Sequence, residues 1–305
     1  MTPKISIETH TAHSLLKTCV EQISETIEQN HAINKQQFIN THFQDLDDKT
    51  LGLEFSTLTI LAGASASGKT NLMLSIAQQI SRKSKAAVGI VSLRLSASNL
   101  MMRVISAYCG IRTNRLYEGS LRQAEWDAFS SNIENIKSIP LFVQDQAFYD
   151  VDDLLSRIEE LAQSQNCKLI FIDDFPFSYC HTDHAKRESE RFVFALQQLT
   201  RKLNVAVVLT AGVNYDVDKR QDPRPKLSDL SVHGDIVSAA DMVMCLYSKQ
   251  MYSIDANQAI TELNILKGVT GKILLKNEMS EYCRFSDFRE VSIWNWKADE
   301  VNQPV

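Results

Sequence analysis

STLTILAGASASGKTNLMLSI, residues 56–76, decides the fold of this chain. The apolar run 58–61 leads into Gly63, four intervening residues and then Gly68-Lys69-Thr70, and apolar residues at helical spacing follow. This is the pattern G-x-x-x-x-G-K-[ST] between a strand and a helix, which is the setting the motif requires. The stretch therefore predicts a phosphate-binding loop.

The residue types in this loop follow from the chemistry of phosphate binding. Gly63 and Gly68 permit backbone angles that a Cβ would forbid, so successive N–H groups can face a phosphate. The helix that begins near Lys69 adds its positive N-terminal end. Lys69 is predicted to reach the phosphates of ATP or ADP, and the Thr70 hydroxyl to ligate Mg²⁺. The predicted nucleotide-binding residues are Gly63, Ala64, Ser65, Ala66, Ser67, Gly68, Lys69 and Thr70.

Residues 168–174, KLIFIDD, predict the second half of the site. A buried parallel strand places a carboxylate at its C-terminal edge, where ligands bind in open α/β sheets. Asp173 is predicted to hold Mg²⁺ through water. A later cluster contains metal-ligand residue types, but no second cluster completes a metal site around it: Cys180, His181, Asp183 and His184.

The composition is that of an ordinary globular protein. Of the 305 residues, 44% are hydrophobic and 23% charged, and no apolar run approaches the roughly 18 residues of a membrane span. Residues 1–14 lack the apolar core of a secretory signal, and the six cysteines form no C-x-x-C pair. These features predict a cytoplasmic protein with reduced thiols and no membrane partner. The net charge of −5 limits nucleic-acid contact to local loops or a shared pore.

Strand and helix patterns alternate along the chain and predict an α/β fold with a doubly wound, mostly parallel sheet. Beyond the phosphate loop, apolar runs predict strands at 87–93, 141–143, 168–172, 205–210 and 242–247. Helices are predicted at 99–108, 120–136, 151–164 and 191–203, with a polar loop at 181–190. Three more strands, at about 260–267, 272–276 and 281–285, predict an antiparallel edge.

Two segments keep two interpretations each. Residues 14–29 predict an amphipathic helix that either packs on its own domain or docks on a neighbouring subunit. Residues 215–235 form either a solvated loop or a loop that contacts nucleic acid. The cations that favour the second interpretation are Lys219, Arg220, Arg224 and Lys226.

From about residue 41 to 286 the chain resembles the C-terminal, RecA-like motor domain of the DnaB-type replicative helicases. The resemblance rests on the phosphate loop together with THFQDLDDKTLGL (41–53), SLRLSASNLMMRV (92–104), LIFIDD (169–174), RKLNVAVVLT (201–210) and RPKLSDL (224–230). It implies a tail and linker helix at 1–40 that docks on the next subunit, a RecA-like nucleotide-binding domain at 41–297 and a polar tail at 298–305. It also implies a hexameric ring with ATP between subunits, pore loops that hold single-stranded DNA, and other replication proteins as partners.

Several positions depart from the family pattern. Arg94 is matched to the general-base Glu, Gly212 to a polar sensor Gln, Ser231 to an Arg, and Val269 to the arginine finger. A guanidinium accepts no proton at a workable pH, and an arginine finger is worth roughly 10³–10⁵ in rate. The binding residues remain. The resemblance therefore implies an ATP-binding protein of DNA replication with weak or lost hydrolysis, a pseudoenzyme that serves as a scaffold or accessory.

The alternative is an active ATP-dependent 5′→3′ DNA helicase with substitute residues. Lys69 and Asp174 are its candidate catalytic residues, because an acid directly after the metal-binding Asp is the base in many other P-loop ATPases. Neighbouring strand residues point to opposite faces, an objection that weakens at a strand end. Lys267 or Lys272 would serve as a cation across a subunit boundary, and Arg94 would contact a phosphate. A third class, a P-loop kinase, needs a small-substrate lid for which the sequence shows no signal.

Overall fold

The structure, a computed structural model, describes residues 37–146, 150–175, 183–233, 235–251 and 260–287. The chain divides into two compact units, Met1–Phe38 and Ile39–Val305, and nearly all the described elements belong to the second. The predicted helix at 14–29 and the polar tail at 298–305 lie outside the described residues. No helix within the described ranges combines the length and the apolar character that a membrane crossing requires.

The elements, in chain order, are as follows. The strands are β1 (Phe38–Ile39), β2 (Leu53–Glu54), β3 (Leu58–Gly63), β4 (Val88–Ser92), β5 (Leu141–Gln144), β6 (Leu169–Asp173), β7 (Ala206–Gly212), β8 (Met242–Tyr247), β9 (Ile260–Lys267), β10 (Gly271–Glu278) and β11 (Arg284–Asp287). The α-helices are α3 (Gln44–Thr50), α4 (Lys69–Gln79), α5 (Ala97–Cys109), α6 (Thr113–Glu118), α7 (Gln123–Lys137), α8 (Val151–Gln163), α9 (Asp183–Leu203), α10 (Ile236–Ala239) and α11 (Met279–Tyr282). A π-helix, η1 (Ile80–Ser84), continues α4, and the 3₁₀ helices are η2 (Tyr215–Lys219), η3 (Leu227–His233) and η4 (Lys249–Met251).

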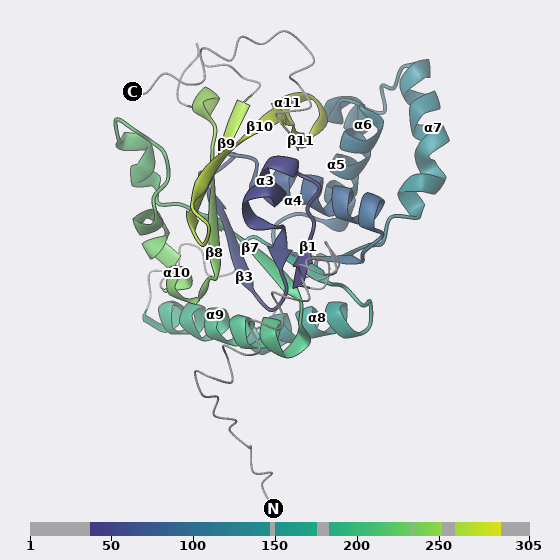
Figure 1. Cartoon of the computed structure of the whole chain (residues 1–305). Coiled ribbons are helices and arrows are strands. Elements are labelled where there is room, and N and C mark those ends of the chain that lie inside the picture. Colours follow the sequence, from purple (N-terminus) through teal and green to yellow (C-terminus); the bar gives the residue numbers. More distant parts are fainter. Residues whose placement is uncertain (1–36, 147–149, 176–182, 234, 252–259, 288–305) are drawn as a thin grey trace, which may run out of the picture. The chain divides into compact units, whose positions relative to one another are not determined.

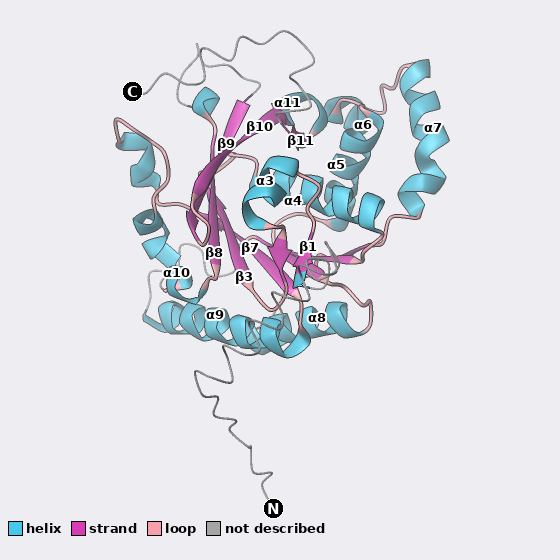
Figure 2. Ribbon diagram, in the orientation of Figure 1, coloured by secondary structure: helices cyan, strands magenta, loops and turns pink. Residues whose placement is uncertain are grey.

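Among the described residues, nine strands form one sheet in the order β11-β10-β9-β8-β3-β7-β6-β4-β5, and Figure 2 shows its twist. β3 lies between β7 and β8, and all pairs from β8 to β5 are parallel. β9, β10 and β11 extend the sheet as antiparallel strands. The prediction of a mostly parallel sheet with an antiparallel edge is confirmed.

Helices cover both faces of the sheet, which is why its central strands are apolar along their whole length. Every residue of β3 and β6 is buried. Successive side chains of β3 enter different cores: Ile60 packs with α8 and α9, whereas Leu61 packs with α4 and α5. Figure 1 shows α8 and α9 side by side, and they are in contact. This arrangement holds the carboxyl end of β3, where the phosphate loop begins, in the middle of the sheet.

The prediction of a polar loop at 181–190 was wrong for its described part, because α9 begins at Asp183 rather than at 191. Tertiary contacts hold the polar turns of this helix. The Ser189 hydroxyl is buried and donates to the His233 carbonyl at 3.0 Å. Arg191 forms an ion pair with Asp152 of α8 at 2.7 Å. Within the polar stretch, the turn at Ser189 is therefore held by η3, and the next residue but one is held by α8.

The predicted strand at 281–285 was also misplaced, since α11 occupies 279–282 and β11 follows it. The Asn277 side chain accepts a hydrogen bond from the Met279 backbone N–H at 2.9 Å, and Cys283 ends the helix with a φ of 51°. The Phe285 backbone N–H then donates to the Ser75 hydroxyl at 3.0 Å. The last strand of the sheet is thereby attached to α4, the helix of the phosphate loop.

Candidate nucleotide-binding site

The phosphate loop has the predicted positive φ at Gly68 but not at Gly63, and Ala66 adopts a φ of 60° instead. Gly68 has a φ of 98° at the N-terminus of α4, a conformation that L-residues rarely adopt. A Cβ at Gly68 would collide with the Met279 sulfur, and one at Gly63 would meet the Ser67 hydroxyl. The Ser67 hydroxyl is itself buried and has no hydrogen-bond partner among the described residues. The loop therefore offers backbone N–H groups and a spare hydroxyl, which fit a phosphate.

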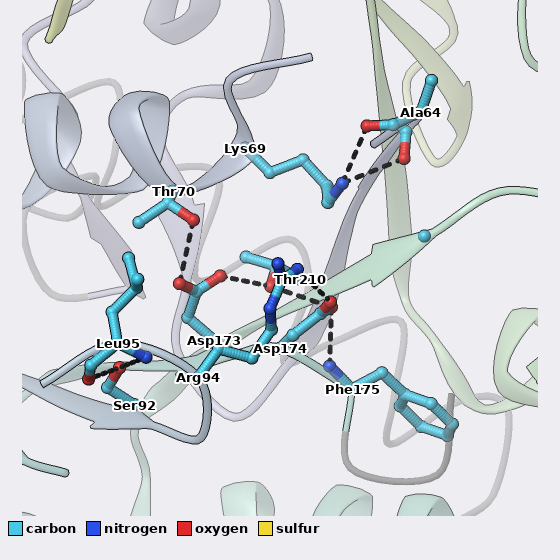
Figure 3. A network of polar contacts seen from close by, with 12 residues as sticks. Ala64, Lys69, Thr70, Ser92, Arg94, Leu95, Asp173, Asp174, Phe175 and Thr210 are labelled. Atoms are coloured by element: carbon cyan, nitrogen blue, oxygen red, sulfur yellow. Dashed lines mark hydrogen bonds and ion pairs between the residues drawn. The ribbon is translucent and has the colours of Figure 1, made fainter. Parts of the chain in front are cut away.

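Lys69 folds back over this loop. Its Nζ donates to the carbonyls of Gly63 and Ala64, both at 3.0 Å (Figure 3). The residue is only 9% exposed. Burial lowers the pKa of the Lys69 ammonium, and the nearby carboxylates of Asp174 and Asp173 act in the opposite direction. A buried ammonium with one N–H left over is suited to an anionic ligand.

Asp173, the last residue of β6, lies opposite the start of α4. Its carboxylate accepts hydrogen bonds from the Thr70 hydroxyl at 2.9 Å and the Thr210 hydroxyl at 2.7 Å (Figure 3). The residue is 3% exposed. Burial raises the pKa of Asp173, and the two hydroxyl donors counteract that rise. The structure brings the two predicted Mg²⁺ ligands, Thr70 and Asp173, into contact.

These two residues fit a magnesium ion chemically. Both are hard oxygen donors, and Mg²⁺ usually takes one or two protein oxygens together with phosphate oxygens and water. In the described part of the chain, no group of three or more His, Cys, Asp and Glu forms a further metal cluster. The side chains of the predicted cluster at 180–184 lie outside the described residues.

Asp174 lies at the same edge of the sheet as Asp173. It accepts a hydrogen bond from the Phe175 backbone N–H at 2.8 Å and pairs with the Arg94 guanidinium at 3.3 Å. The Thr210 hydroxyl, which donates to Asp173, also lies 3.4 Å from the Asp174 Oδ1 (Figure 3). Because β6 ends at Asp173, strand alternation does not direct the two carboxylates to opposite faces of the sheet.

Sequence reasoning missed two polar residues of this region. The sequence indicates Thr210 only as the end of an apolar run. In the structure β7 pairs with β6, and the Thr210 hydroxyl therefore reaches Asp173. His233 is buried, and its Nε2 lies 2.6 Å from the carbonyl of Gly212. Burial lowers the pKa of His233. Gly212 in turn pairs in register with Gly63, so the imidazole lies one strand away from the phosphate loop.

The four predicted DNA-contacting cations lie between β7 and α10, on a segment that contains η2 and η3 rather than a plain loop. Three of their side chains have intramolecular partners. Lys219 pairs with Asp216 at 2.7 Å, Arg220 with Asp229 at 2.7 Å, and Arg224 with Glu262 at 2.9 Å. For Lys226, the backbone N–H donates to Asp229 at 2.7 Å. The Lys219 pair is exposed and contributes little to stability, so a phosphate group can replace its carboxylate. Arg220 and Arg224, in contrast, each make two hydrogen bonds to a largely buried carboxylate of their own subunit.

The positions matched to an arginine finger lie at the turn between β9 and β10. Val269 is 59% exposed. The Lys267 ammonium donates to the Val237 carbonyl of α10 at 2.7 Å, and the Lys272 ammonium lies 3.9 Å from Glu262. The structure thus places both lysines against their own subunit.

A mostly parallel sheet whose central strand runs into G-x-x-x-x-G-K-T, with a carboxylate on a nearby strand, defines a RecA-like P-loop protein. The model of the DnaB-like helicase C-terminal domain matches residues 39–287, and the chain belongs to this family.

Similar proteins agree with this assignment. A "Probable replicative DNA helicase" of Trieres chinensis is 31% identical over 82% of this chain and 57% of its own length. The replicative DNA helicase DnaB of Geobacillus stearothermophilus is 30% identical over 77% of this chain and 53% of its own length. The chain thus spans a little over half the length of these relatives.

Two solved structures confirm the RecA-like fold. One is an ATPase domain with a TM-score of 0.79 at 22% identity, and the match covers 92% of this chain and 100% of that domain. The other is a DnaB-like replicative helicase, whose structure was described with its interactions with primase. It has a TM-score of 0.78 at 22% identity, over 94% of this chain and 68% of its own.

Proposed function

We propose that this protein binds ATP or ADP with Mg²⁺ and hydrolyses ATP weakly or not at all, as a nucleotide-binding scaffold or accessory of DNA replication. Gly63–Thr70 would hold the phosphates, and Thr70 and Asp173 would hold the ion. Bound Mg²⁺ would neutralise phosphate charge. Lys69 would exchange its two carbonyl partners for phosphate oxygens.

The observation that supports weak hydrolysis is the contact between Arg94 and Asp174 at 3.3 Å. A guanidinium stands at the position matched to the family's base, and it accepts no proton whichever partner it has. Val269 is uncharged, so the position matched to the arginine finger cannot stabilise the charge that develops on the transferred phosphate. The residues that would bind the nucleotide are thus retained, whereas those that would catalyse its hydrolysis are replaced.

The test is ATP turnover with and without single-stranded DNA, beside nucleotide affinity, in the wild type and in Lys69→Ala. We expect the wild type to bind nucleotide and to turn over no faster than Lys69→Ala. The variant should bind at least about tenfold more weakly, since a charge-assisted hydrogen bond is lost. DNA-stimulated turnover that the wild type has and Lys69→Ala lacks would contradict lost hydrolysis.

The second candidate function is an active 5′→3′ helicase in which Asp174 has taken over as base. Its support is the placement of Asp174 at the carboxyl edge, with its side chain 13% exposed and close to Asp173. In that case Asp174→Asn should abolish a turnover that the wild type shows, while nucleotide affinity stays the same. Equal turnover in both proteins would remove Asp174 from the reaction.

We further propose single-stranded DNA as a partner, bound by Lys219, Arg220, Arg224 and Lys226 in the channel of a ring. Each phosphate contact contributes a slope of about 0.7 to the dependence of log affinity on log salt for a single strand. Neutralising the four cations together should weaken binding and flatten this slope. Unchanged binding and slope would exclude the segment as a DNA site.

The remaining proposals concern assembly. A homo-oligomer, a hexameric ring, would be held by residues 14–29, and light scattering on a chain that starts near Gln36 tests this. An unchanged mass would exclude that role. Because one similar structure was described with its interactions with primase, a replication protein is the proposed further partner. The four free cysteines within the described residues support work in the reducing cytoplasm.

A further inference from the structure

The turn that carries Arg94 is fixed, whereas its side chain is exposed. Ser92 ends β4 and pairs in register with Asp173. The Ser92 hydroxyl donates to the Leu95 carbonyl at 2.6 Å, and the Leu93 N–H donates to the Asp173 carbonyl at 2.6 Å. The Arg94 side chain is 67% exposed. Its guanidinium can therefore exchange partners by rotation of side-chain bonds while the backbone stays in place.

The present partner holds Arg94 by a single contact. The Nη1 atom lies 3.3 Å from the Asp174 Oδ2 (Figure 3), whereas charge-assisted hydrogen bonds are typically about 2.7–2.9 Å long. A guanidinium can make two parallel hydrogen bonds to a phosphate, and it is weakly hydrated, so phosphate is a better partner than one distant carboxylate oxygen.

The charges around Arg94 place it beside the phosphate loop. Burial lowers the pKa of Lys69, the carboxylates of Asp174 and Asp173 raise it, and the Arg94 guanidinium lowers it. Arg94 contacts Asp174, and both carboxylates act on Lys69, so two cations and two carboxylates lie at one sheet edge. The third phosphate of a nucleotide adds negative charge at this edge, which attracts Arg94 away from Asp174.

We propose that Arg94 is a specificity-determining residue that binds the terminal phosphate of a nucleoside triphosphate. Its contact with Asp174 is then the resting position, which it leaves when that phosphate is present. The inference rests on the proposed nucleotide binding at the phosphate loop. Two consequences follow: the site prefers a triphosphate to a diphosphate, and binding of the triphosphate uncovers the Asp174 carboxylate.

Calorimetry of the full chain with ADP and with a non-hydrolysable ATP analogue, each with Mg²⁺, tests this assignment. The wild type should bind the analogue more tightly than ADP. Arg94→Gln should reduce that preference about ten- to a hundredfold, the loss of one or two charge-assisted hydrogen bonds, and leave ADP affinity unchanged. Arg94→Lys should retain part of the preference, because lysine carries the positive charge but lacks the two parallel N–H groups of a guanidinium. The control is Arg82→Gln, because Arg82 stacks on Tyr108 beyond the far end of α4.

The outcomes separate this inference from the proposed function. If both nucleotides bind and Arg94→Gln keeps the wild-type preference, or if the wild type has no preference, Arg94 does not contact the terminal phosphate. If the wild type binds neither nucleotide, the proposed function itself fails. Asp174→Asn removes the resting partner and should keep or increase the preference for the triphosphate. A loss in this variant equal to that in Arg94→Gln would overturn the exchange of partners.

Discussion

Replacing Thr210 by Val should destabilise the protein in the absence of nucleotide. The Thr210 hydroxyl is fully buried and donates to the Asp173 carboxylate at 2.7 Å. Val has nearly the same shape, so the change removes the donor and leaves no large cavity. A buried charged acceptor that loses a donor costs about 1–3 kcal/mol, and the single remaining hydroxyl donor, Thr70 at 2.9 Å, favours the upper half of that range.

In a domain of this size, about 1 kcal/mol corresponds to roughly 2–4 °C, so the unfolding midpoint should fall by about 4–12 °C. Thr210→Ser is the matched control: it keeps the hydroxyl, loses a methyl group and should cost about 1 kcal/mol. Thermal scans of the three proteins without Mg²⁺ and nucleotide measure both changes. A Thr210→Val midpoint at or above that of Thr210→Ser would refute the reasoning.

The stabilising effect of the hydrogen bond between Thr210 and Asp173 has a predictable pH dependence. Burial raises the pKa of Asp173 in the folded protein, so its contribution to stability falls as pH rises from the unfolded pKa to the folded pKa. The hydrogen bond from Thr210 lowers that pKa. Its loss in Thr210→Val should therefore cost most above the folded pKa, where Asp173 is ionised. At more acidic pH, where both proteins carry a neutral carboxyl group, the deficit of Thr210→Val should shrink.

Three further changes test the site and the core. Burial lowers the pKa of Lys69, which means that the folded protein disfavours the charged form of this side chain. Lys69→Met should therefore keep or raise the unfolding midpoint near neutral pH, while nucleotide affinity falls. A lower unfolding midpoint would contradict this prediction. Gly68→Ala should cost about 1–3 kcal/mol more in denaturant unfolding than Gly119→Ala, because only the first Cβ meets other atoms. Burial raises the pKa of both Cys167 and Cys245 to about 12, so native-state alkylation followed by mass spectrometry should leave both unmodified until the protein unfolds.

The phosphate loop and the end of β6 could be predicted from sequence because their information is local. A glycine with positive φ, a lysine and a hydroxyl residue at fixed spacing identify the loop wherever the domain places it. Likewise, Asp173 follows an apolar run, and a buried strand must deliver its last residue to the sheet edge. Both predictions needed no knowledge of the strand order.

The partners of these residues depend on contacts that are distant in sequence. Thr210 reaches Asp173 only because β7 lies next to β6, and His233 reaches Gly212 only because η3 returns to the end of β7. In the polar part of α9, the Ser189 hydroxyl likewise reaches the His233 carbonyl only because η3 lies beside this helix. Hydrophobic periodicity carries no information about such pairs, so these residues could be assigned only with the structure.

The central position of β3 has a consequence for the synthesis of the protein. β3 is the first strand of the large sheet to be made, yet both of its neighbours, β7 and β8, are made only after β4, β5 and β6 (Figure 1). The Leu58 N–H even donates to a carboxylate 183 residues later, that of Asp241. Chains emerge from the ribosome N-terminus first, and such distant pairings form slowly. A nascent chain that ends before β8 would contain the whole G-x-x-x-x-G-K-T motif but would lack one of the two strands that flank β3, so we expect ATP binding to begin only after β8 has been made.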